Sequence, residues 1–169
     1  MTTHYALWAL PVPRIGAVLT DEIDRLTKAA GYPIFAPHLT LASMDQKPDI
    51  AALSSLANYT YPFSLIATGF ERGNTLSQAL YLSLAPDRCF KRAQRGCREH
   101  LQQDSKLSDT PHISLYYGVD PPDPVQVLLP EIEEVEFDRI GLIRIESPIT
   151  DPREVTDWRV EAKLNLGSG

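Results

Sequence analysis

A short motif that could carry out acid–base chemistry on a phosphate group occurs twice in this sequence. The chain reads PHLTL around His38 and, 74 residues later, PHISL around His112. On a strand, alternate side chains share one face, so His38 and Thr40 are expected to point the same way, as are His112 and Ser114. The apolar residues between them would face the core, leaving an imidazole and a hydroxyl on the other face of each strand.

Two imidazoles and two hydroxyls suit a displacement at a cyclic phosphodiester. Near neutral pH one histidine can take a proton from water while the other gives a proton to the departing ribose oxygen. Hydroxyl groups can donate hydrogen bonds to the phosphoryl oxygens, over which charge is spread in the transition state. The residues do not say which of His38 and His112 is the base. The other two histidines, His4 and His100, lack such a motif and are predicted to lie at the surface.

The elements that must position the two motifs follow the same order in both parts of the chain. Hydrophobic patterns predict strands at 5–10, 38–43, 63–70, 79–84, 112–117, 137–145 and 158–164, helices at 15–30, 50–57, 87–101 and briefly from 121, and a loop at 148–157. This recurrence indicates an internal duplication with halves 4–75 and 76–165. We therefore predict one bilobal domain over residues 1–169, whose approximate two-fold axis brings the polar faces of the motif strands together across a cleft.

Composition narrows the classes of partner. The net charge of −6 argues against a protein that wraps a long nucleic acid, although a small anionic ligand can still bind in a local pocket. The two cysteines, Cys89 and Cys97, are too few for a disulfide scaffold. No leader-like segment and no run of 18 apolar residues is present, so we expect a cytoplasmic, monomeric protein without a membrane partner. Residues 166–169 are predicted to form a flexible tail.

Other chemistries lack their motifs. The sequence contains no HExxH, no His-x-His, no cysteine pair with ligand spacing, no P-loop, no GxGxxG and no GxSxG. We therefore expect neither a metal ion nor an organic cofactor. The acidic run from Glu131 to Glu136 is interpreted as the solvated face of a helix, and the apolar residues at 137–145 as core.

The paired motifs, PHLTLAS and PHISLYYG, resemble those of the two-histidine phosphoesterases, and the likeness covers nearly the whole chain. Together with LWALP near the N-terminus, they are most similar to the plant and fungal 2',3'-cyclic nucleotide phosphodiesterases. This resemblance implies a bilobal α+β fold with two antiparallel sheets that line a central cleft and helices outside. It also implies metal-independent hydrolysis of nucleoside 2',3'-cyclic phosphates to 2'-phosphates, with ADP-ribose 1'',2''-cyclic phosphate, a by-product of tRNA splicing, as another substrate.

The resemblance also implies a role for each motif residue. His38 and His112 become the acid–base pair, while Thr40 and Ser114 hold the phosphate. The aromatic residue of the second motif falls on Tyr117, where it would contact phosphate or base. Simple alternation puts Tyr117 on the leucine face, so this role requires a strand end or a bulge. Two more aromatic residues, Tyr116 and Trp8, are the alternatives for a base pocket, and each could instead be packed in the core.

Three functions remain open at this point. The first is a phosphodiesterase for small cyclic nucleotides, and the acidic net charge favours it. The second is an RNA-end-processing relative of the 2'-5' RNA ligase type, which acts on cyclic ends of longer RNA. The third is a nucleotide-binding module without catalysis, although such a module has no need of two proton-transfer groups.

Overall fold

Strands and helices form close to the places that the hydrophobic pattern predicts. The computed structural model describes residues 2–101, 103 and 105–167. Its strands are β1 (Thr2–Pro11), β2 (Leu39–Met44), β3 (Phe63–Arg72), β4 (Leu80–Leu84), β5 (Lys106–Leu107), β6 (His112–Tyr116), β7 (Glu134–Ser147) and β8 (Arg159–Asn165). Its α-helices are α1 (Pro13–Ala29), α2 (Ile50–Tyr59) and α3 (Arg88–Leu101), with 3-10 turns η1 (Leu76–Gln78), η2 (Pro124–Gln126) and η3 (Pro152–Asp157).

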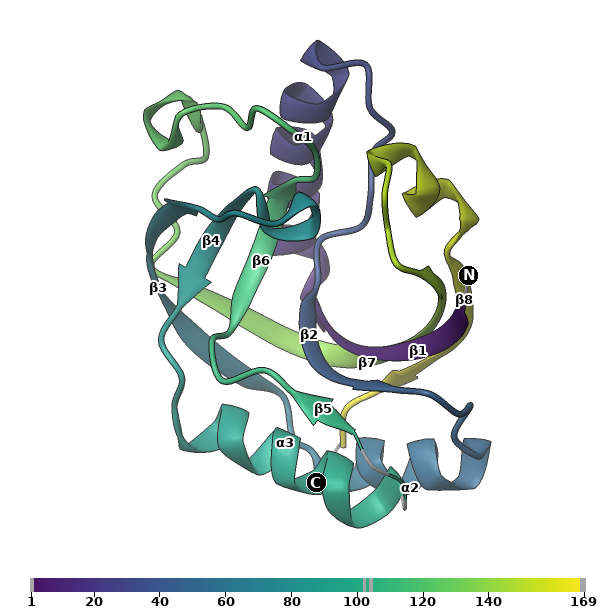
Figure 1. Ribbon diagram of the computed structural model, residues 1–169. Helices are drawn as coiled ribbons and strands as arrows, with labels where there is room; N and C mark the ends of the chain where they lie inside the picture. Colours follow the sequence, from purple (N-terminus) through teal and green to yellow (C-terminus); the bar gives the residue numbers. More distant parts are fainter. Residues whose placement is uncertain (1, 102, 104, 168–169) are drawn as a thin grey trace.

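The strands form one continuous antiparallel sheet with two arms (Figure 1). The order is β1-β2-β6-β4-β3-β7-β8, with β5 beside β2 and a further pairing of β1 with β7. The first residues of β7 pair with β3, whereas its later residues pair with β1 and β8. The α+β class and the antiparallel pairing are confirmed. The two expected sheets are arms of one sheet, because the 14-residue strand β7 is long enough to belong to both.

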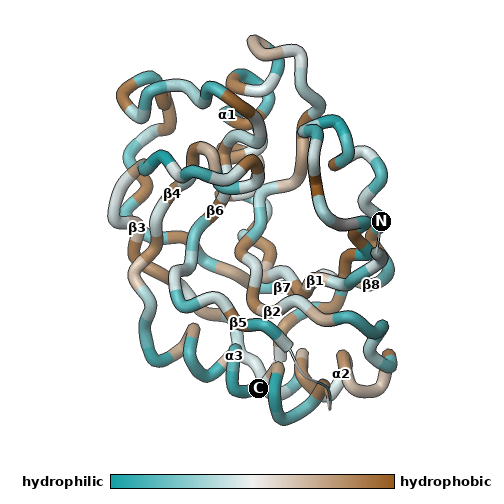
Figure 2. Tube along the Cα trace, viewed as in Figure 1, coloured by the Kyte–Doolittle hydropathy of each residue, from teal (hydrophilic) through white to brown (hydrophobic). Residues whose placement is uncertain are grey.

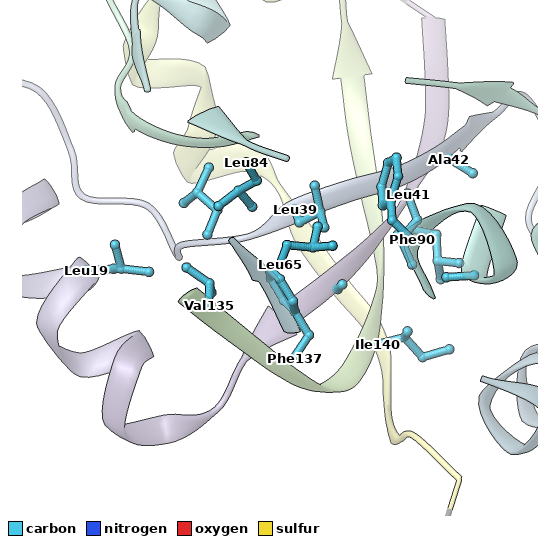
Figure 3. Close-up of a cluster of buried hydrophobic side chains, with 14 of the residues drawn as sticks. Leu19, Leu39, Leu41, Ala42, Leu65, Leu84, Phe90, Val135, Phe137 and Ile140 are labelled. Carbon is cyan, nitrogen blue, oxygen red and sulfur yellow. The ribbon is translucent and has the colours of Figure 1, made fainter. Parts of the chain in front are cut away.

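The helices cover the outside of the sheet and bury its apolar face. In Figure 1, α2 and α3 lie side by side below the sheet, while α1 stands beside β6 and β1. The side chains of Leu39 and Leu41 in the first motif strand, and those of Ile113 and Leu115 in the second, are all buried. Figure 3 shows Leu39 and Leu41 in one cluster with Phe90 of α3. The predicted leucine face of the motif strands is therefore the core face.

The start of α3 is fixed by a predicted cap. The backbone N–H of Phe90 donates a hydrogen bond of 2.8 Å to Oδ1 of Asp87, which satisfies one of the free donors of the first turn. The helix then buries its apolar stripe, whose members Phe90, Ala93, Cys97 and Leu101 are all in the core. Its charged side faces outward.

Three predictions about the second half of the chain are wrong. The short helix expected from residue 121 is reduced to the 3-10 turn η2, and the loop at 148–157 contains the 3-10 turn η3. The acidic run is not a helix face: Glu134 and Glu136 alternate along β7 with the buried Val135.

The expected tail is partly packed. Leu166 is buried, and the backbone N–H of Gly167 donates to the carbonyl oxygens of Ala57 and Thr60, at 2.8 and 2.9 Å. These contacts hold the end of the last strand against α2. Ser168 and Gly169 lie outside the described residues. No helix in the described part of the chain is long and apolar enough to span a membrane.

Candidate active site

The two motif strands meet at the junction between the arms of the sheet. The strands β2 and β6 pair through one bridge, which joins Leu39 to Ile113. Above this bridge lies a cavity of about 450 Å³. Among the residues that line it are His38, Thr40, His112, Ser114, Tyr117 and Trp8. All of the predicted site residues except Tyr116 therefore face one space.

Each motif strand contains a β-bulge at the leucine three residues after its histidine. In β2, the consecutive residues Leu7 and Trp8 of β1 pair with Ala42 and Thr40, so Leu41 is the extra residue. In β6, the same shift makes Leu115 the extra residue. A bulge reverses the side-chain alternation beyond it. The fifth residue after each histidine is therefore turned toward the cavity.

Each histidine is held by the carbonyl oxygen two residues before it. Nδ1 of His38 lies 2.7 Å from the carbonyl oxygen of Ala36, and Nδ1 of His112 lies 3.0 Å from that of Thr110. A carbonyl oxygen can only accept, so Nδ1 must carry the hydrogen in both rings. Nε2 is then the nitrogen left to accept a proton, or to donate one when the ring is charged.

The first histidine lies in a water-poor, aromatic environment. His38 is only 6% exposed, and its ring stacks on the indole of Trp8 with centroids 3.5 Å apart. Trp158 approaches the same ring edge-on, with centroids 6.2 Å apart. Burial is the main reason that the pKa of His38 is lowered to about 4; the hydrogen bond to Ala36 opposes this shift, and the charge of His112 adds a smaller lowering. The neutral ring is the stable form of His38 near pH 7.

The second histidine is more open to solvent. His112 is half-buried, and its aromatic neighbour Tyr81 meets it edge-on, with centroids 5.2 Å apart. Tyr81 occupies the place in β4 that Trp8 occupies in β1, because each pairs with the hydroxyl residue of its motif. The Tyr81 hydroxyl donates to Oε2 of Glu71 at 2.9 Å. The ring of His112 is therefore more accessible to water than that of His38.

The two hydroxyl groups also differ. Ser114 is buried, and its Oγ donates a hydrogen bond of 2.9 Å to the carbonyl oxygen of Ser77. Thr40 is half-buried, and its hydroxyl has no hydrogen bond to any residue in the described part of the chain. Thr40 can donate to a bound anion at once, whereas the Ser114 hydroxyl must first turn away from Ser77.

Tyr117 reaches the cavity because β6 bulges and then ends at Tyr116. Its ring stacks on Phe35 with centroids 4.1 Å apart, and its hydroxyl lies 3.5 Å from Nε2 of His38. Burial raises the pKa of Tyr117, with a smaller opposing effect from a hydrogen bond to Ser114. The sequence predicted that this position of Tyr117 needs a strand end or a bulge, and both are present.

Tyr116 does not line the cavity. It is buried in the core, packs near Tyr32 with centroids 5.9 Å apart, and its hydroxyl donates to the carbonyl oxygen of Val119 at 3.4 Å. The residue after Tyr117 is Gly118, at φ 152°, where a Cβ would come within 2.6 Å of the Tyr32 ring. The bulge explains the placement, because it moves Tyr116 off the face that simple alternation assigned to it.

Sequence reasoning missed several residues of the cavity wall. Trp158, at the end of η3, contacts Trp8 and Tyr117 edge-on, and no local pattern marked it. His4 was predicted to lie at the surface, but it is half-buried and lines the cavity. The alternation of β1, counted back from Trp8, would have placed it there. Ser43 also lines the cavity, because the bulge at Leu41 turns it inward.

Among the described residues, no group of three or more histidine, cysteine or acidic side chains is placed to hold a metal ion. The second predicted surface histidine, His100, lies on α3 away from the cavity, with Nδ1 2.8 Å from Oγ of Ser55. Cys97 is buried in the core, where burial raises its pKa to about 12. Neither belongs to the candidate site.

Solved structures with this architecture include several of one bacterial protein. LigT of E. coli complexed with 3'-AMP is 19% identical, with a TM-score of 0.62 over 99% of this chain and 100% of that chain. LigT complexed with phosphate is 16% identical, with a TM-score of 0.59 over 98% of both chains. TT0787 of Thermus thermophilus is 18% identical, with a TM-score of 0.58 over 98% of this chain and 100% of that one. These likenesses establish the shared fold.

The family comparison uses the sequence itself. No curated protein matches the chain significantly. The family model of the 2'-5' RNA ligase superfamily matches residues 12–148, which include both histidine motifs and the strands between them. This match covers most of the chain, and the structures above share the same fold along its whole length. The chain therefore belongs to the 2'-5' RNA ligase superfamily, the two-histidine phosphoesterases.

Proposed function

We propose that this phosphoesterase hydrolyses nucleoside 2',3'-cyclic phosphates to 2'-phosphates without a metal ion. The observation that carries the proposal is the pair of imidazoles on one cavity, each fixed through Nδ1 so that Nε2 is the nitrogen that can exchange a proton with substrate or water. Such a pair can supply both proton transfers of the reaction. The proposal keeps the narrower resemblance to plant and fungal cyclic phosphodiesterases, and it includes ADP-ribose 1'',2''-cyclic phosphate as a substrate.

The different surroundings of the two rings favour one direction of proton flow. His38, whose charged form is disfavoured by burial, is proposed as the general base that takes a proton from the attacking water. His112, which is more open to solvent, is proposed as the general acid. The water oxygen bonds to phosphorus, the bond from phosphorus to the ribose 3' oxygen breaks, and that oxygen receives the proton of His112. Exchange with solvent then restores both rings.

The remaining groups would bind the substrate. Thr40 and Ser114 are proposed to donate hydrogen bonds to the phosphoryl oxygens as charge develops on them. Tyr117 is proposed to hold Nε2 of His38 as an acceptor until water replaces its hydroxyl. Trp8 is only 4% exposed and has His38 against one face, so we propose that it excludes water from the base and does not stack on the nucleobase.

The direct test is hydrolysis of 2',3'-cyclic AMP in the presence of EDTA, with the product identified by ³¹P NMR. We expect turnover with a bell-shaped pH dependence and a 2'-phosphate product. No turnover, or turnover only with an added divalent ion, would contradict the proposal. A non-catalytic binding module would bind the nucleotide in the same assay without consuming it.

A second candidate is processing of cyclic phosphates at the ends of RNA. Its support is the superfamily to which the chain belongs and a cationic surface next to the cavity, described below. A comparison of kcat/KM between 2',3'-cyclic AMP and an oligonucleotide with a 2',3'-cyclic end separates the two candidates. A large preference for the oligonucleotide favours RNA ends.

A further inference from the structure

One helix carries an unusual share of the positive charge of this acidic protein. Of the chain's 16 lysine and arginine residues, five lie within the 14 residues of α3, while the net charge of the whole chain is −6. They are Arg88, Lys91, Arg92, Arg95 and Arg98. The positive charges are therefore distributed unevenly over the chain, although its net charge is negative.

All five cations are exposed and share one side of the helix. At 3.6 residues per turn they fall within an arc of about 120°, opposite the stripe that is buried in the core. In Figure 2 the outer side of α3 is coloured as hydrophilic along most of its length. We call these five residues the α3 cation stripe.

Few acidic side chains lie close to the α3 cation stripe. The ion pairs found among the described residues do not include any of its members. On the helix itself only Glu99 is acidic, and Asp87 accepts from the backbone at the first turn. Like charges four residues apart, such as Lys91 and Arg95, destabilise a helix. Cations near a helix N-terminus are also unfavourable, so an anionic ligand would relieve a repulsion that the fold leaves in place.

A cavity of about 540 Å³ lies along the stripe. Lys91, Arg95 and Arg98 line it together with one acid, Asp109. The chain at the end of β5 separates the two spaces: Leu107 in β5 and Asp109 in the following loop line the α3 cavity, whereas Ser108 between them lines the catalytic cavity. The side-chain N–H of Gln94 in α3 donates to the carbonyl oxygen of Ser108 at 2.6 Å, which ties this loop to the helix.

Aromatic rings accompany the stripe at its other side. A second cavity is lined by Tyr59 with Arg88, Arg92 and Arg95. The guanidinium of Arg92 lies over the rings of Tyr59 and Tyr61, 5.0 and 5.2 Å from their centroids. Tyr61 is 49% exposed. Cations interleaved with exposed aromatic rings are the usual binding surface for single-stranded nucleic acid, where bases stack and phosphates pair with charge.

We propose that the α3 cation stripe, with Tyr59 and Tyr61, binds the backbone and bases of single-stranded RNA whose cyclic-phosphate end lies in the catalytic cavity. The placement of the cyclic-phosphate end in the catalytic cavity rests on the proposed function. The exposed ring of Tyr61 favours RNA over an anionic membrane, for which cations alone would serve. The charge argument against a long nucleic acid applies to the average surface and not to this face.

The first experiment measures binding without catalysis. A fluorescently labelled single-stranded RNA of about 12 nucleotides, ending in an ordinary 3'-hydroxyl, is titrated with protein between about 50 and 200 mM salt. We expect the double variant K91E/R95E to bind at least about tenfold more weakly than the wild type. Each phosphate contact to a single strand contributes about 0.7 to the slope of log K against log salt, so the slope should fall by about 1.4.

A matched control separates this surface from overall charge. Arg14 and Lys28 are exposed on α1, and R14E/K28E changes the net charge by the same amount as K91E/R95E. The control variant should keep most of the RNA affinity. Tyr61→Ala should weaken binding with little change in the salt slope, because it removes stacking and no charge. Equal losses in the two double variants would overturn the proposal.

Kinetics connect the surface to the active site. For K91E/R95E, kcat/KM should fall about tenfold for an oligonucleotide with a 2',3'-cyclic end and change less than about twofold for 2',3'-cyclic AMP. If both substrates lose equally, the stripe does not bind the chain of the substrate. If neither is hydrolysed while RNA still binds through α3, the proposed function fails and the RNA surface stands. If vesicles containing phosphatidylserine bind α3 and RNA does not, the proposal is overturned.

Discussion

The two motif strands are built alike and placed in different surroundings. In both, Nδ1 of the histidine bonds to the carbonyl oxygen two residues earlier, and a leucine forms the bulge three residues later. In both, an aromatic residue of the adjacent strand contacts the imidazole. However, Trp8 stacks on His38 and shields it, whereas Tyr81 meets His112 edge-on and leaves it half-exposed.

This difference teaches that equal motifs need not have equal roles. The shared hydrogen bonds and bulges set the geometry, so each strand presents the same atoms to the cavity. Burial sets the charge of the first ring, because a low-dielectric environment disfavours the protonated form of His38. A two-fold arrangement of residues can thus contain one base and one acid.

The largest expected effect is loss of either imidazole. His38→Ala and His112→Ala should each lower kcat by at least about 10²-fold, since one positioned proton transfer contributes about 10² to 10⁴. The double variant should be little worse than the poorer single variant, because the two rings act in one step. Steady-state rates on 2',3'-cyclic AMP, with circular dichroism as a folding control, provide the check. Near-wild-type rates in either single variant would remove that ring from the mechanism.

The second-largest expected effect is a pH dependence of the free energy of unfolding that comes from His38. The pKa of His38 falls from 6.5 to about 4 on folding, so between these values the unfolded chain binds a proton that the folded protein excludes. The free energy of unfolding should therefore decrease from about pH 6.5 to about pH 4, by about 3 kcal/mol from this group, and level off below pH 4.

Urea unfolding across this pH range measures the effect. His38→Gln should lose the contribution, whereas the matched variant His112→Gln should keep it. The same pH dependence in both variants would mean that His38 is not the buried, neutral ring.

Substitution of the aromatic neighbours of the two histidines should have smaller effects, which differ between the two rings. Trp8→Phe opens the stack on His38, so the pKa of His38 should rise toward 6.5 and the acidic limb of kcat/KM should move to higher pH. A shift of one pH unit corresponds to about a tenfold lower rate on the acidic limb. Tyr81→Phe should leave this limb in place. Proton NMR titration of the imidazoles gives the same comparison without turnover, and equal shifts in both variants would refute the shielding role of Trp8.

The smallest effect concerns the fifth residue after each histidine. Tyr117→Phe removes the long hydrogen bond to Nε2 of His38 and should lower kcat/KM by a few-fold, about 1 kcal/mol. Ser43→Ala alters the corresponding place in the first motif, where no contact to a histidine is found among the described residues, and should change kcat/KM less than about twofold. A larger loss in Ser43→Ala would mean that Ser43 and Tyr117 have more similar roles than their different contacts indicate.

The sequence predicted a large part of the site because the motif residues are close together in the chain. His38 and Thr40, like His112 and Ser114, share a face through simple strand alternation, and this holds as far as the bulge. Alternation fails beyond Leu41 and Leu115. The position of Tyr117 could therefore be stated only as a condition, and Ser43 was missed.

Contacts between residues far apart in the chain could not be predicted from the sequence, for a different reason. Trp158 comes from the end of η3, 120 residues after His38, and no local pattern relates the two. The acidic run before Phe137 was assigned to a helix because charged residues suit an exposed helix and an exposed strand face alike. Its pairing with β3 decided for the strand.

The sequence by itself determined which groups the candidate site contains: two histidines, two hydroxyls and the strands that carry them follow from residue types and their local spacing. Only the tertiary structure decided which imidazole is shielded. Burial depends on what other parts of the chain bring to the ring, and here those parts are Trp8 on the adjacent strand and Trp158 near the C-terminus. The pKa of His38 belongs to that assembled environment, which its pentapeptide alone does not specify.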